Sequence, residues 1–257
     1  MPIAFTIAAA FVFGLLIGSF LNACAYRIPR GISIARGRSF CPRCKAQIRA
    51  YDNIPLASWI VLRGRCRDCG APISIRYPLV EALTAVLFAG LAAYDGLTPL
   101  LLAHFVFVAT LILVSDIDLS VRIIPDVVIL PAAAVGLAMM IAIDPGRWME
   151  WLFAGLGAAA FLFLAGLIYE KLRRVEGMGM GDVKMALCMG FFLGWSVVPA
   201  MFLAFVIGAV VGIVLMSRGE TGKTAIPFGP FLAVGAVISL FLGPTLIHAY
   251  LHLALRS

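Results

Sequence analysis

Residues 98–116 read TPLLLAHFVFVATLILVSD, and His104 is the one ionisable side chain in this run before its closing acid. A helix of about 20 such residues is long enough to cross the hydrocarbon core of a membrane. The whole chain has the same character, with 63% hydrophobic residues, 13% charged residues and a mean hydropathy of +1.05. Soluble proteins carry about 25% charged residues. The composition therefore excludes an ordinary soluble domain and predicts an all-α polytopic membrane protein.

The apolar segments predict about eight transmembrane helices. They are expected at about residues 3–25, 78–94, 98–116, 126–143, 150–170, 183–196, 199–216 and 228–250. The sixth is too short to cross about 30 Å at 1.5 Å per residue. It either starts below the membrane surface or borrows residues from a tilted seventh helix.

The positive charges predict how these helices are oriented. Eleven of the 20 Lys and Arg residues lie between Arg27 and Arg76, and eighteen fall in connections assigned to the cytoplasm. Only Arg147 and Arg256 fall on the other side. Because short cytoplasmic loops are enriched in Lys and Arg, both termini are expected in the periplasm. The first span has no preceding positive charge, so it is expected to be an uncleaved helix. This charge pattern does not favour nucleic-acid binding.

Four of the six cysteines form two Cys-x-x-Cys pairs in the one long polar stretch. Two such pairs, with 21 residues between them, predict a structural zinc site of the ribbon type with four thiolate ligands. Free or redox-active thiols are the alternative. The predicted organisation is a first span at 1–26, a cytoplasmic tetracysteine loop at 27–77 and a membrane-embedded catalytic domain at 78–257. The expected metal ligands are Cys41, Cys44, Cys66 and Cys69.

Acidic residues near predicted spans are scarce, and two groups of them are candidates for chemistry. The third span ends in Asp116-Ile117-Asp118, and the sixth begins with Gly179-Met180-Gly181-Asp182. Both groups are expected at the cytoplasmic ends of their helices, where two carboxylates can share a proton and activate water for peptide hydrolysis. The two glycines suit close backbone approach and a positive φ. Alternatively, the acids cap helices or pair with Arg122 and Lys184.

Several motifs extend this interpretation. The segment 179–182 resembles the GxGD signature of membrane aspartyl proteases, and the run from Asp118 to Pro125-Asp126 resembles the first-aspartate motif of the bacterial type IV prepilin peptidase family. Other matches follow in the family's order: Gly18-Ser19-Phe20-Leu21-Asn22, Asn53-Ile54-Pro55, Leu62-Arg63-Gly64, Arg76-Tyr77-Pro78, Glu81 and Ile226-Pro227-Phe228-Gly229-Pro230. Together they span almost the whole chain.

The resemblance implies which residues act. It places the catalytic pair on Asp118 and Asp182, with Asp116 as a rival for the first position. Residues two apart on a helix point about 200° apart, so only one of these two acids can face Asp182. The family's aspartate lies seven residues before the proline of Pro-Asp, which selects Asp118. The expected supports of the active-site loops are Gly179, Gly181, Pro125 and Asp126.

The resemblance also implies a function. It suggests a protease of the bacterial inner membrane that cleaves type IV prepilins or type II secretion pseudopilins at the cytoplasmic face. Related proteins with a cysteine loop methylate the new N-terminus with S-adenosylmethionine, so that activity is expected too. The basic loop suggests contact with anionic membrane lipid. A proton-coupled transporter and a non-enzymatic assembly factor are the alternatives.

Overall fold

The computed structural model describes residues 2–173, 179–218 and 227–254. Arg256 and Ile226, named above, lie outside these ranges, as do Arg174 and Lys223, two of the eighteen positive charges assigned to the cytoplasm. Within them the chain is helical, and its extended pairings are two isolated bridges, Phe40 with Gln47 and Arg65 with Pro72. The predicted all-α fold class is confirmed.

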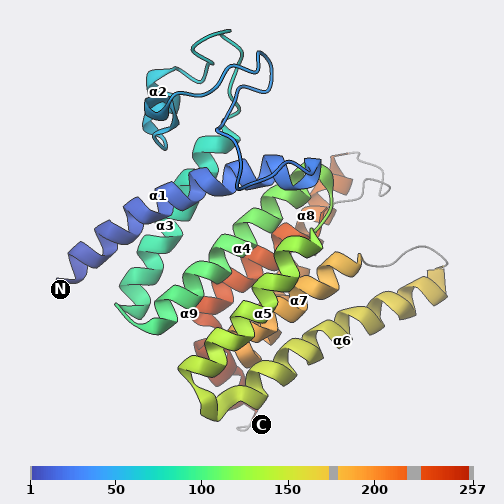
Figure 1. Cartoon of the computed structure of the whole chain (residues 1–257). Coiled ribbons are helices and arrows are strands. Elements are labelled where there is room, and N and C mark those ends of the chain that lie inside the picture. Colours follow the sequence, from blue (N-terminus) through green and yellow to red (C-terminus); the bar gives the residue numbers. More distant parts are fainter. Residues whose placement is uncertain (1, 174–178, 219–226, 255–257) are drawn as a thin grey trace. The chain divides into compact units, whose positions relative to one another are not determined.

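Eight helices of 14 or more residues in the described part of the chain occupy the predicted spans (Figure 1). They are α1 (Ile3–Arg27), α3 (Arg76–Asp95), α4 (Pro99–Val121), α5 (Asp126–Ile143), α6 (Trp148–Arg173), α7 (Met180–Leu193), α8 (Val197–Ser217) and α9 (Gly229–Ala254). Seven segments there are long and apolar enough to cross a membrane, and one of them, Met180–Ser217, contains both α7 and α8. The predicted short sixth helix is α7, with 14 residues.

The chain divides into two compact units, residues 1–116 and 117–257. The boundary lies inside α4, between Asp116 and Ile117. The three parts predicted above were defined by their place relative to the membrane, and these two units are defined by how closely the chain packs. The three-part organisation stays a prediction.

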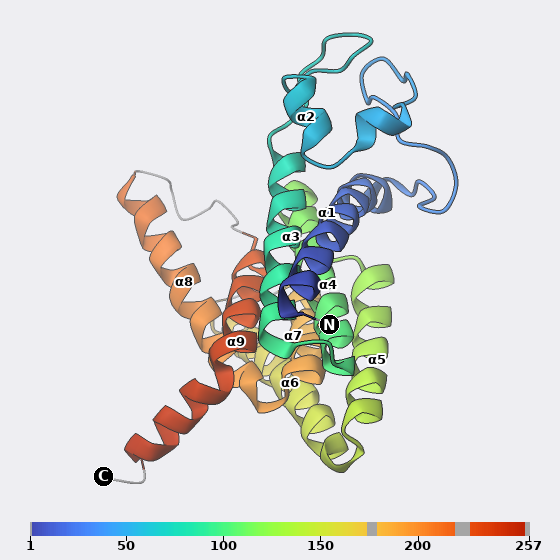
Figure 2. The ribbon, with the colours of Figure 1, turned by 90° about the vertical axis from the view of Figure 1, so that its left-hand side faces the viewer.

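In the first unit, α1 packs closely against α3, as Figures 1 and 2 show. A Cβ atom on Gly14 would lie 2.6 Å from the Cα of Ala85, and one on Gly18 would lie 2.7 Å from the Cα of Glu81. Both distances are too short for a side chain, so glycine is required at these two positions. Lipid tails are as apolar as leucine, and close contact of this kind is a main source of helix association in membranes.

The same contact continues for one more turn at the end of α1. The side-chain amide of Asn22 donates a hydrogen bond of 3.0 Å to the carbonyl oxygen of Tyr77. Residues 14, 18 and 22 on α1 therefore face residues 85, 81 and 77 on α3, in antiparallel register. Gly14 and Gly18 form a Gly-x-x-x-Gly pattern, a known signal for close packing of membrane helices, which the sequence analysis above did not use.

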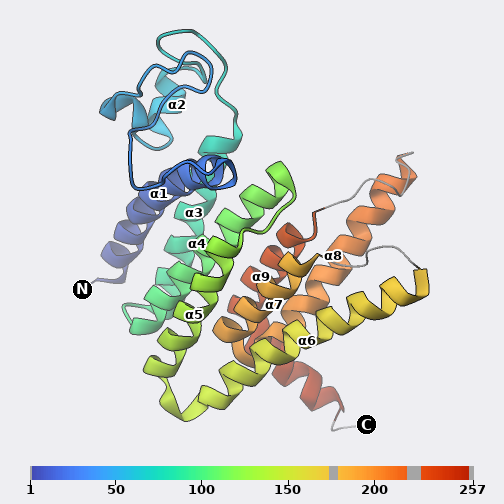
Figure 3. The same cartoon turned by 45° about the vertical axis from the view of Figure 1, so that its right-hand side comes forward.

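In the second unit, α7 packs against α5, α6, α8 and α9, and Figure 3 shows α6 and α7 side by side. A Cβ on Gly190 of α7 would lie 2.4 Å from the Cα of Gly155 on α6. One on Gly155 would lie 2.2 Å from the ring of Phe191, and one on Gly136 of α5 would lie 2.2 Å from the ring of Phe192. Glycine thus lets backbone meet backbone at Gly155, and it makes room for an aromatic ring at Gly136.

Many large apolar side chains remain exposed along these helices. Examples are Phe5 at 58%, Leu79 at 60% and Phe202 at 66%. A soluble protein rarely presents apolar surface on this scale. Such residues suit contact with lipid tails, in agreement with the hydropathy of the spans.

Replacing Gly190 with valine is expected to destabilise the second unit. The new side chain meets the backbone of α6, which cannot move aside as a flexible side chain would, so we expect a loss of about 2 kcal/mol or more. The control is Gly157→Val on α6, because no atom lies within 4 Å of a Cβ built there. Thermal unfolding in detergent measures both variants, and equal melting temperatures would contradict the packing described above.

Candidate functional site

The last turn of α4 places Asp118 near the end of the helix. Arg122 follows with a φ of 57°, a left-handed conformation that ends the helix, and its N–H bonds the carbonyl oxygen of Asp118 at 2.9 Å. A short connection then leads through Pro125 to the start of α5. The helix end therefore fixes the backbone of Asp118.

The Asp118 side chain is buried, with 6% exposed. Its Oδ2 atom accepts a hydrogen bond of 3.1 Å from the backbone N–H of Gly229, at the start of α9. A Cβ on Gly229 would lie 2.7 Å from the same oxygen, so a larger residue would displace the carboxylate. The Asp182 carboxylate, in the first turn of α7, is close enough to interact electrostatically with that of Asp118.

The side chain of Ile124 packs between the two glycine-containing segments. A Cβ on Gly181 would lie 2.8 Å from the Cβ of Ile124, and one on Gly229 would lie 3.5 Å from its Cδ1. The glycines therefore allow the backbones at the starts of α7 and α9 to approach the α4–α5 connection. This arrangement brings together two acids that are far apart in sequence.

The expectation of a positive φ in the glycine motif is wrong. Gly179 has a φ of −66°, and Gly181 lies within α7 and has no positive φ. Glycine is needed at position 181 because of the contact with Ile124, which leaves no room for a Cβ atom. The expectation that the two glycines allow close approach by an extended peptide stays a prediction, and at position 181 the neighbouring group in the structure is the Ile124 side chain.

The rival acid, Asp116, faces a different partner. The Arg76 guanidinium, at the start of α3, donates hydrogen bonds to both the side chain and the carbonyl oxygen of Asp116. The opposite directions expected for Asp116 and Asp118 are therefore observed. Asp116 is engaged with Arg76 in the first unit, whereas Asp118 meets Gly229 and Asp182 in the second.

Pro125 and Asp126 support the start of α5. Pro125 is the N-cap residue, in an extended conformation, and Asp126 is the first helical residue. The Lys184 ammonium on α7 contacts both carboxylate oxygens of Asp126, at 2.7 and 2.8 Å. Asp126 is therefore an acid that pairs with a nearby cation, which is the alternative considered above. This ion pair connects α5 with α7.

The two Cys-x-x-Cys segments adopt the same turn. In the first, the Cys41 N–H bonds Ala46 O and the Lys45 N–H bonds Cys41 O, both at 2.9 Å. In the second, Cys66 bonds Ala71 at 2.8 Å and Gly70 bonds Cys66 at 2.9 Å in the same way. The fifth residue of each turn has a positive φ, 60° at Lys45 and 67° at Gly70.

The turns bring the four sulfur atoms together. All four Sγ atoms lie within 4.8 Å of one another, and those of Cys41 and Cys69 are 3.9 Å apart. Tetrahedral zinc with bonds of about 2.3 Å needs sulfur atoms about 3.8 Å apart, so the cluster fits such an ion. The Cys44 backbone N–H lowers the pKa of the Cys41 thiol to about 7, toward the thiolate form that binds metal. At Cys44 the Ala46 N–H acts in the same direction, but burial and the neighbouring cysteine sulfur atoms outweigh it and raise the pKa to about 11, so without a metal the cluster shares its protons unevenly.

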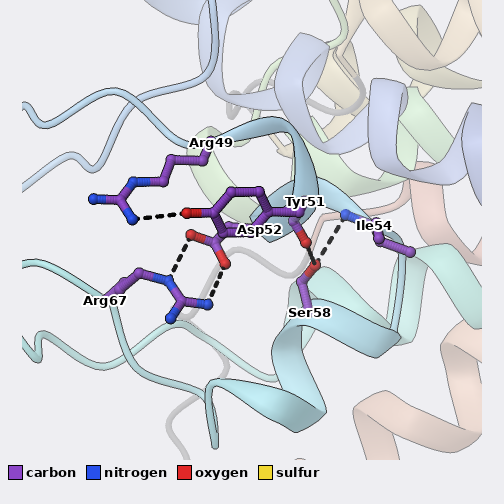
Figure 4. Close-up of polar contacts among 6 residues, drawn as sticks. All are labelled: Arg49, Tyr51, Asp52, Ile54, Ser58 and Arg67. Atoms are coloured by element: carbon purple, nitrogen blue, oxygen red, sulfur yellow. Dashed lines mark hydrogen bonds and ion pairs between the residues drawn. The ribbon is translucent and has the colours of Figure 1, made fainter.

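Polar contacts hold the two halves of this loop together, as Figure 4 shows. The Arg67 guanidinium binds both oxygens of Asp52, at 2.6 and 2.8 Å, and this lowers the pKa of Asp52. Ser58 accepts the N–H of Ile54 at 2.9 Å and donates to the carbonyl of Tyr51 at 3.0 Å. The segment before α2 (Ala57–Val61) is therefore tied to the second cysteine turn.

Comparison with known proteins gives the family. The model of the bacterial peptidase A24 N-terminal domain matches residues 12–94, and that of the type IV leader peptidase family matches residues 105–213. A prepilin leader peptidase/N-methyltransferase of Burkholderia pseudomallei is 37% identical over 95% of this chain and 87% of its own length. The chain belongs to the type IV leader peptidase family. The resemblance drawn from the motifs is confirmed.

Two more members of the family are also named prepilin leader peptidase/N-methyltransferase. The protein of Stutzerimonas stutzeri is 34% identical, and that of Pseudomonas aeruginosa is 33% identical; each alignment covers 98% of this chain and 96% of the relative. No solved structure gives a significant match. With its apolar helices, the chain is an integral inner-membrane protein.

Several contacts around the site were not predicted. One of them is the hydrogen bond from the Gly229 N–H to Asp118. The motif that contains Gly229 was noted in the sequence, but its contact with Asp118 was not predicted, and Gly229 lies outside the matched residues 105–213. The binding of Asp116 by Arg76 was also missed, because no local pattern joins residues 40 positions apart. The role of Ile124 was missed as well, since an isoleucine near a span usually indicates only a lipid contact.

Proposed function

We propose that this chain is an aspartic endopeptidase that removes the leader of type IV prepilins or type II secretion pseudopilins and then N-methylates the new N-terminus. Its relatives are each named for two activities, prepilin leader peptidase and N-methyltransferase. The observation that carries the peptidase half is the electrostatic interaction between Asp118 and Asp182, together with the hydrogen bond from the Gly229 N–H to Asp118.

Two carboxylates that interact electrostatically suit peptide hydrolysis without a metal. Two negative charges a few Å apart are unfavourable, so the pair holds one proton between them. An N–H donor stabilises negative charge on the oxygen that it contacts, so we assign the ionised role to Asp118 and the protonated role to Asp182. Asp118 takes a proton from a water molecule as the oxygen of that water attacks the scissile carbonyl carbon. Asp182 donates a hydrogen bond to the carbonyl oxygen. The leaving nitrogen then takes up the proton.

The site is proposed to open to the cytoplasm, with both termini in the periplasm. Asp118 lies in the last turn of α4 and Asp182 in the first turn of α7, so both acids are at the same membrane face if the helices alternate in direction. Eighteen of 20 Lys and Arg residues fall on that side. A prepilin presents its cleavage site there, between a basic leader and an apolar helix.

Zinc is the proposed occupant of the tetracysteine cluster. Four thiolates leave no open position for water, so the metal is structural and takes no part in cleavage. It would join two turns of a loop that has little apolar core of its own. The methyl donor is proposed to be S-adenosylmethionine, which supplies a methyl group on a positively charged sulfur.

Removing either acid of the pair is expected to abolish cleavage. Asp118→Asn and Asp182→Asn each remove one of the two proton-transfer groups, so we expect cleavage of a purified prepilin to fall by about 10²- to 10⁴-fold. Asp116→Asn should retain much more activity, because it alters the contact with Arg76 and leaves the pair intact. Glu170→Gln, an exposed change on α6, is the control.

The outcomes separate the competing functions. Full activity in Asp118→Asn together with loss in Asp116→Asn would overturn the choice of the first aspartate. If a folded Asp182→Asn protein still supported pilus assembly at the normal level, a non-enzymatic assembly factor would be the better description. Proton-coupled transport that stops in Asp182→Asn, without any prepilin cleavage by the unaltered protein, would favour a transporter.

Metal analysis of the purified protein is expected to give about one zinc per chain. Cys69→Ser should lose most of it, because the cluster then has three thiolates. Cys24→Ala is the matched control, since Cys24 is buried in α1 and lies outside the cluster. Less than about half an equivalent in the unaltered protein would reject the four-thiolate zinc site.

Reporter fusions test the orientation. Alkaline phosphatase fused after Gly146, between α5 and α6, should be active because that connection is expected in the periplasm. The same enzyme fused after Arg218, at the end of α8, should be inactive, and a green fluorescent protein fusion there should fluoresce. The reverse pattern at both positions would show that the chain has the opposite orientation.

A further inference from the structure

A cavity of about 570 Å³ lies within the first unit, and neither Asp118 nor Asp182 is among its lining residues. Its walls come from α1, from the start of α3 and from the tetracysteine loop. Pockets for small molecules and cofactors are usually about 300–1,000 Å³, so the volume suits a ligand of that class. The sequence analysis gave no location for a methyl donor, and the peptidase mechanism uses none of these residues.

The cavity combines aromatic rings with three buried polar side chains. One of them, Arg27, has a guanidinium that donates hydrogen bonds to four backbone carbonyl oxygens between Ser33 and Arg38. Tyr26, Phe40 and Trp59 line it, and each is half-buried. Glu81 and Asn22 line it as well, with 8% and 6% exposed. Aromatic rings suit a planar base, and a carboxylate in a largely apolar wall suits a cation.

The Glu81 carboxylate is held in place from two sides. Its Oε2 atom accepts the N–H of Leu56 at 2.8 Å, and the Ser19 hydroxyl on α1 also lies within hydrogen-bonding reach. Glu81 itself lies where α1 and α3 are closest, since its Cα would be 2.7 Å from a Cβ on Gly18. The position of this carboxylate is therefore fixed by the packing of two helices.

The contact with Leu56 also holds an unusual piece of backbone. Leu56 has φ 59° and ψ −53°, and the Ala57 N–H bonds Pro55 O at 2.6 Å. These values describe a γ-turn, a conformation that is rare and strained for a non-glycine residue. Strained backbone persists where its surroundings hold it, and it is concentrated at functional sites. Here Glu81 holds it, in the wall of the cavity.

We propose that this cavity binds the sulfonium methyl donor, S-adenosylmethionine, with the Glu81 carboxylate facing the positively charged sulfur. This inference rests on the methyl-transfer half of the proposed function and gives that activity a location. The base of the donor lies among the aromatic rings. The donor carries a positive charge that its product lacks, so a carboxylate at this place favours binding of the donor over the product.

The transfer step is simple in terms of bonds. The nitrogen of the new N-terminus, in its neutral amine form, attacks the methyl carbon of the donor. The nitrogen–carbon bond forms as the carbon–sulfur bond breaks, and the electron pair of that bond stays on sulfur to give neutral S-adenosylhomocysteine. The methylated ammonium then loses a proton to water.

Binding measurements on the full-length protein in detergent test the role of Glu81. The ratio of the dissociation constants for S-adenosylhomocysteine and S-adenosylmethionine reports the preference for the charged ligand. Glu81→Gln keeps an oxygen that can accept the Leu56 N–H but removes the charge, so we expect this preference to fall by about tenfold or more. Glu170→Gln is the matched control: it makes the same change of charge in an exposed residue that does not line the cavity, and we expect no change.

Photo-crosslinking locates the donor independently of any variant. Ultraviolet irradiation of the unaltered protein with methyl-labelled S-adenosylmethionine should label peptides within residues 19–27 or 39–81. Labelling confined to residues 117–257 would overturn the proposal. Zinc content and melting temperature show whether Glu81→Gln is folded, and the crosslink decides the matter if it is not.

Methyl transfer by the unaltered protein separates the two possible failures. If it methylates a cleaved pilin while Glu81→Gln keeps the full preference for the charged ligand, the proposed site is wrong and the proposed function stands. An unaltered protein that neither methylates nor binds the donor would overturn both. An equal loss of preference in Glu170→Gln would also reject the specific role of Glu81.

Discussion

Close backbone contact at glycine is the constraint on which both units of this protein depend. Between helices that are surrounded by lipid, apolar side chains gain little by leaving the solvent, because the lipid is itself apolar. Packing must then come from contacts that lipid cannot make. Gly14 and Gly18 allow such contacts between α1 and α3, and Gly155 and Gly190 do so between α6 and α7. The two proposed sites lie beside contacts of this kind: Glu81 against Gly18, and Asp118 against Gly229.

The spans and the metal cluster followed from the sequence because both depend on local patterns. A helix in lipid must satisfy its own backbone hydrogen bonds, so hydropathy alone placed the eight helices. The cysteine turns are also local, and four thiols at that spacing have few other uses. The pair Asp118 and Asp182 needed more. Helix geometry indicated that only one of two neighbouring acids can face Asp182, and the family motif favoured Asp118, which stays a prediction.

The remaining contacts depend on residues that are distant in sequence. Nothing near Asp118 predicts that its partner is the backbone N–H of Gly229, 111 positions away. The prediction of a positive φ at Gly179 and Gly181 was wrong, because the backbone is extended at the first position and helical at the second. The Gly-x-x-x-Gly pattern of α1 was visible and was not used. A search for small residues four apart would have found the contact between α1 and α3.

The connection between α4 and α5 shows what such packing means for changes in chain length. Loops on protein surfaces commonly accept insertions and deletions. This one has four residues, 122–125. The Ile124 side chain of this connection packs against the segments that contain Gly181 and Gly229. Asp126, the first residue after the connection, is bound to Lys184. One added or lost residue would turn Ile124 out of its contact. Among homologous chains, length variation is therefore expected in other connections and not in this one.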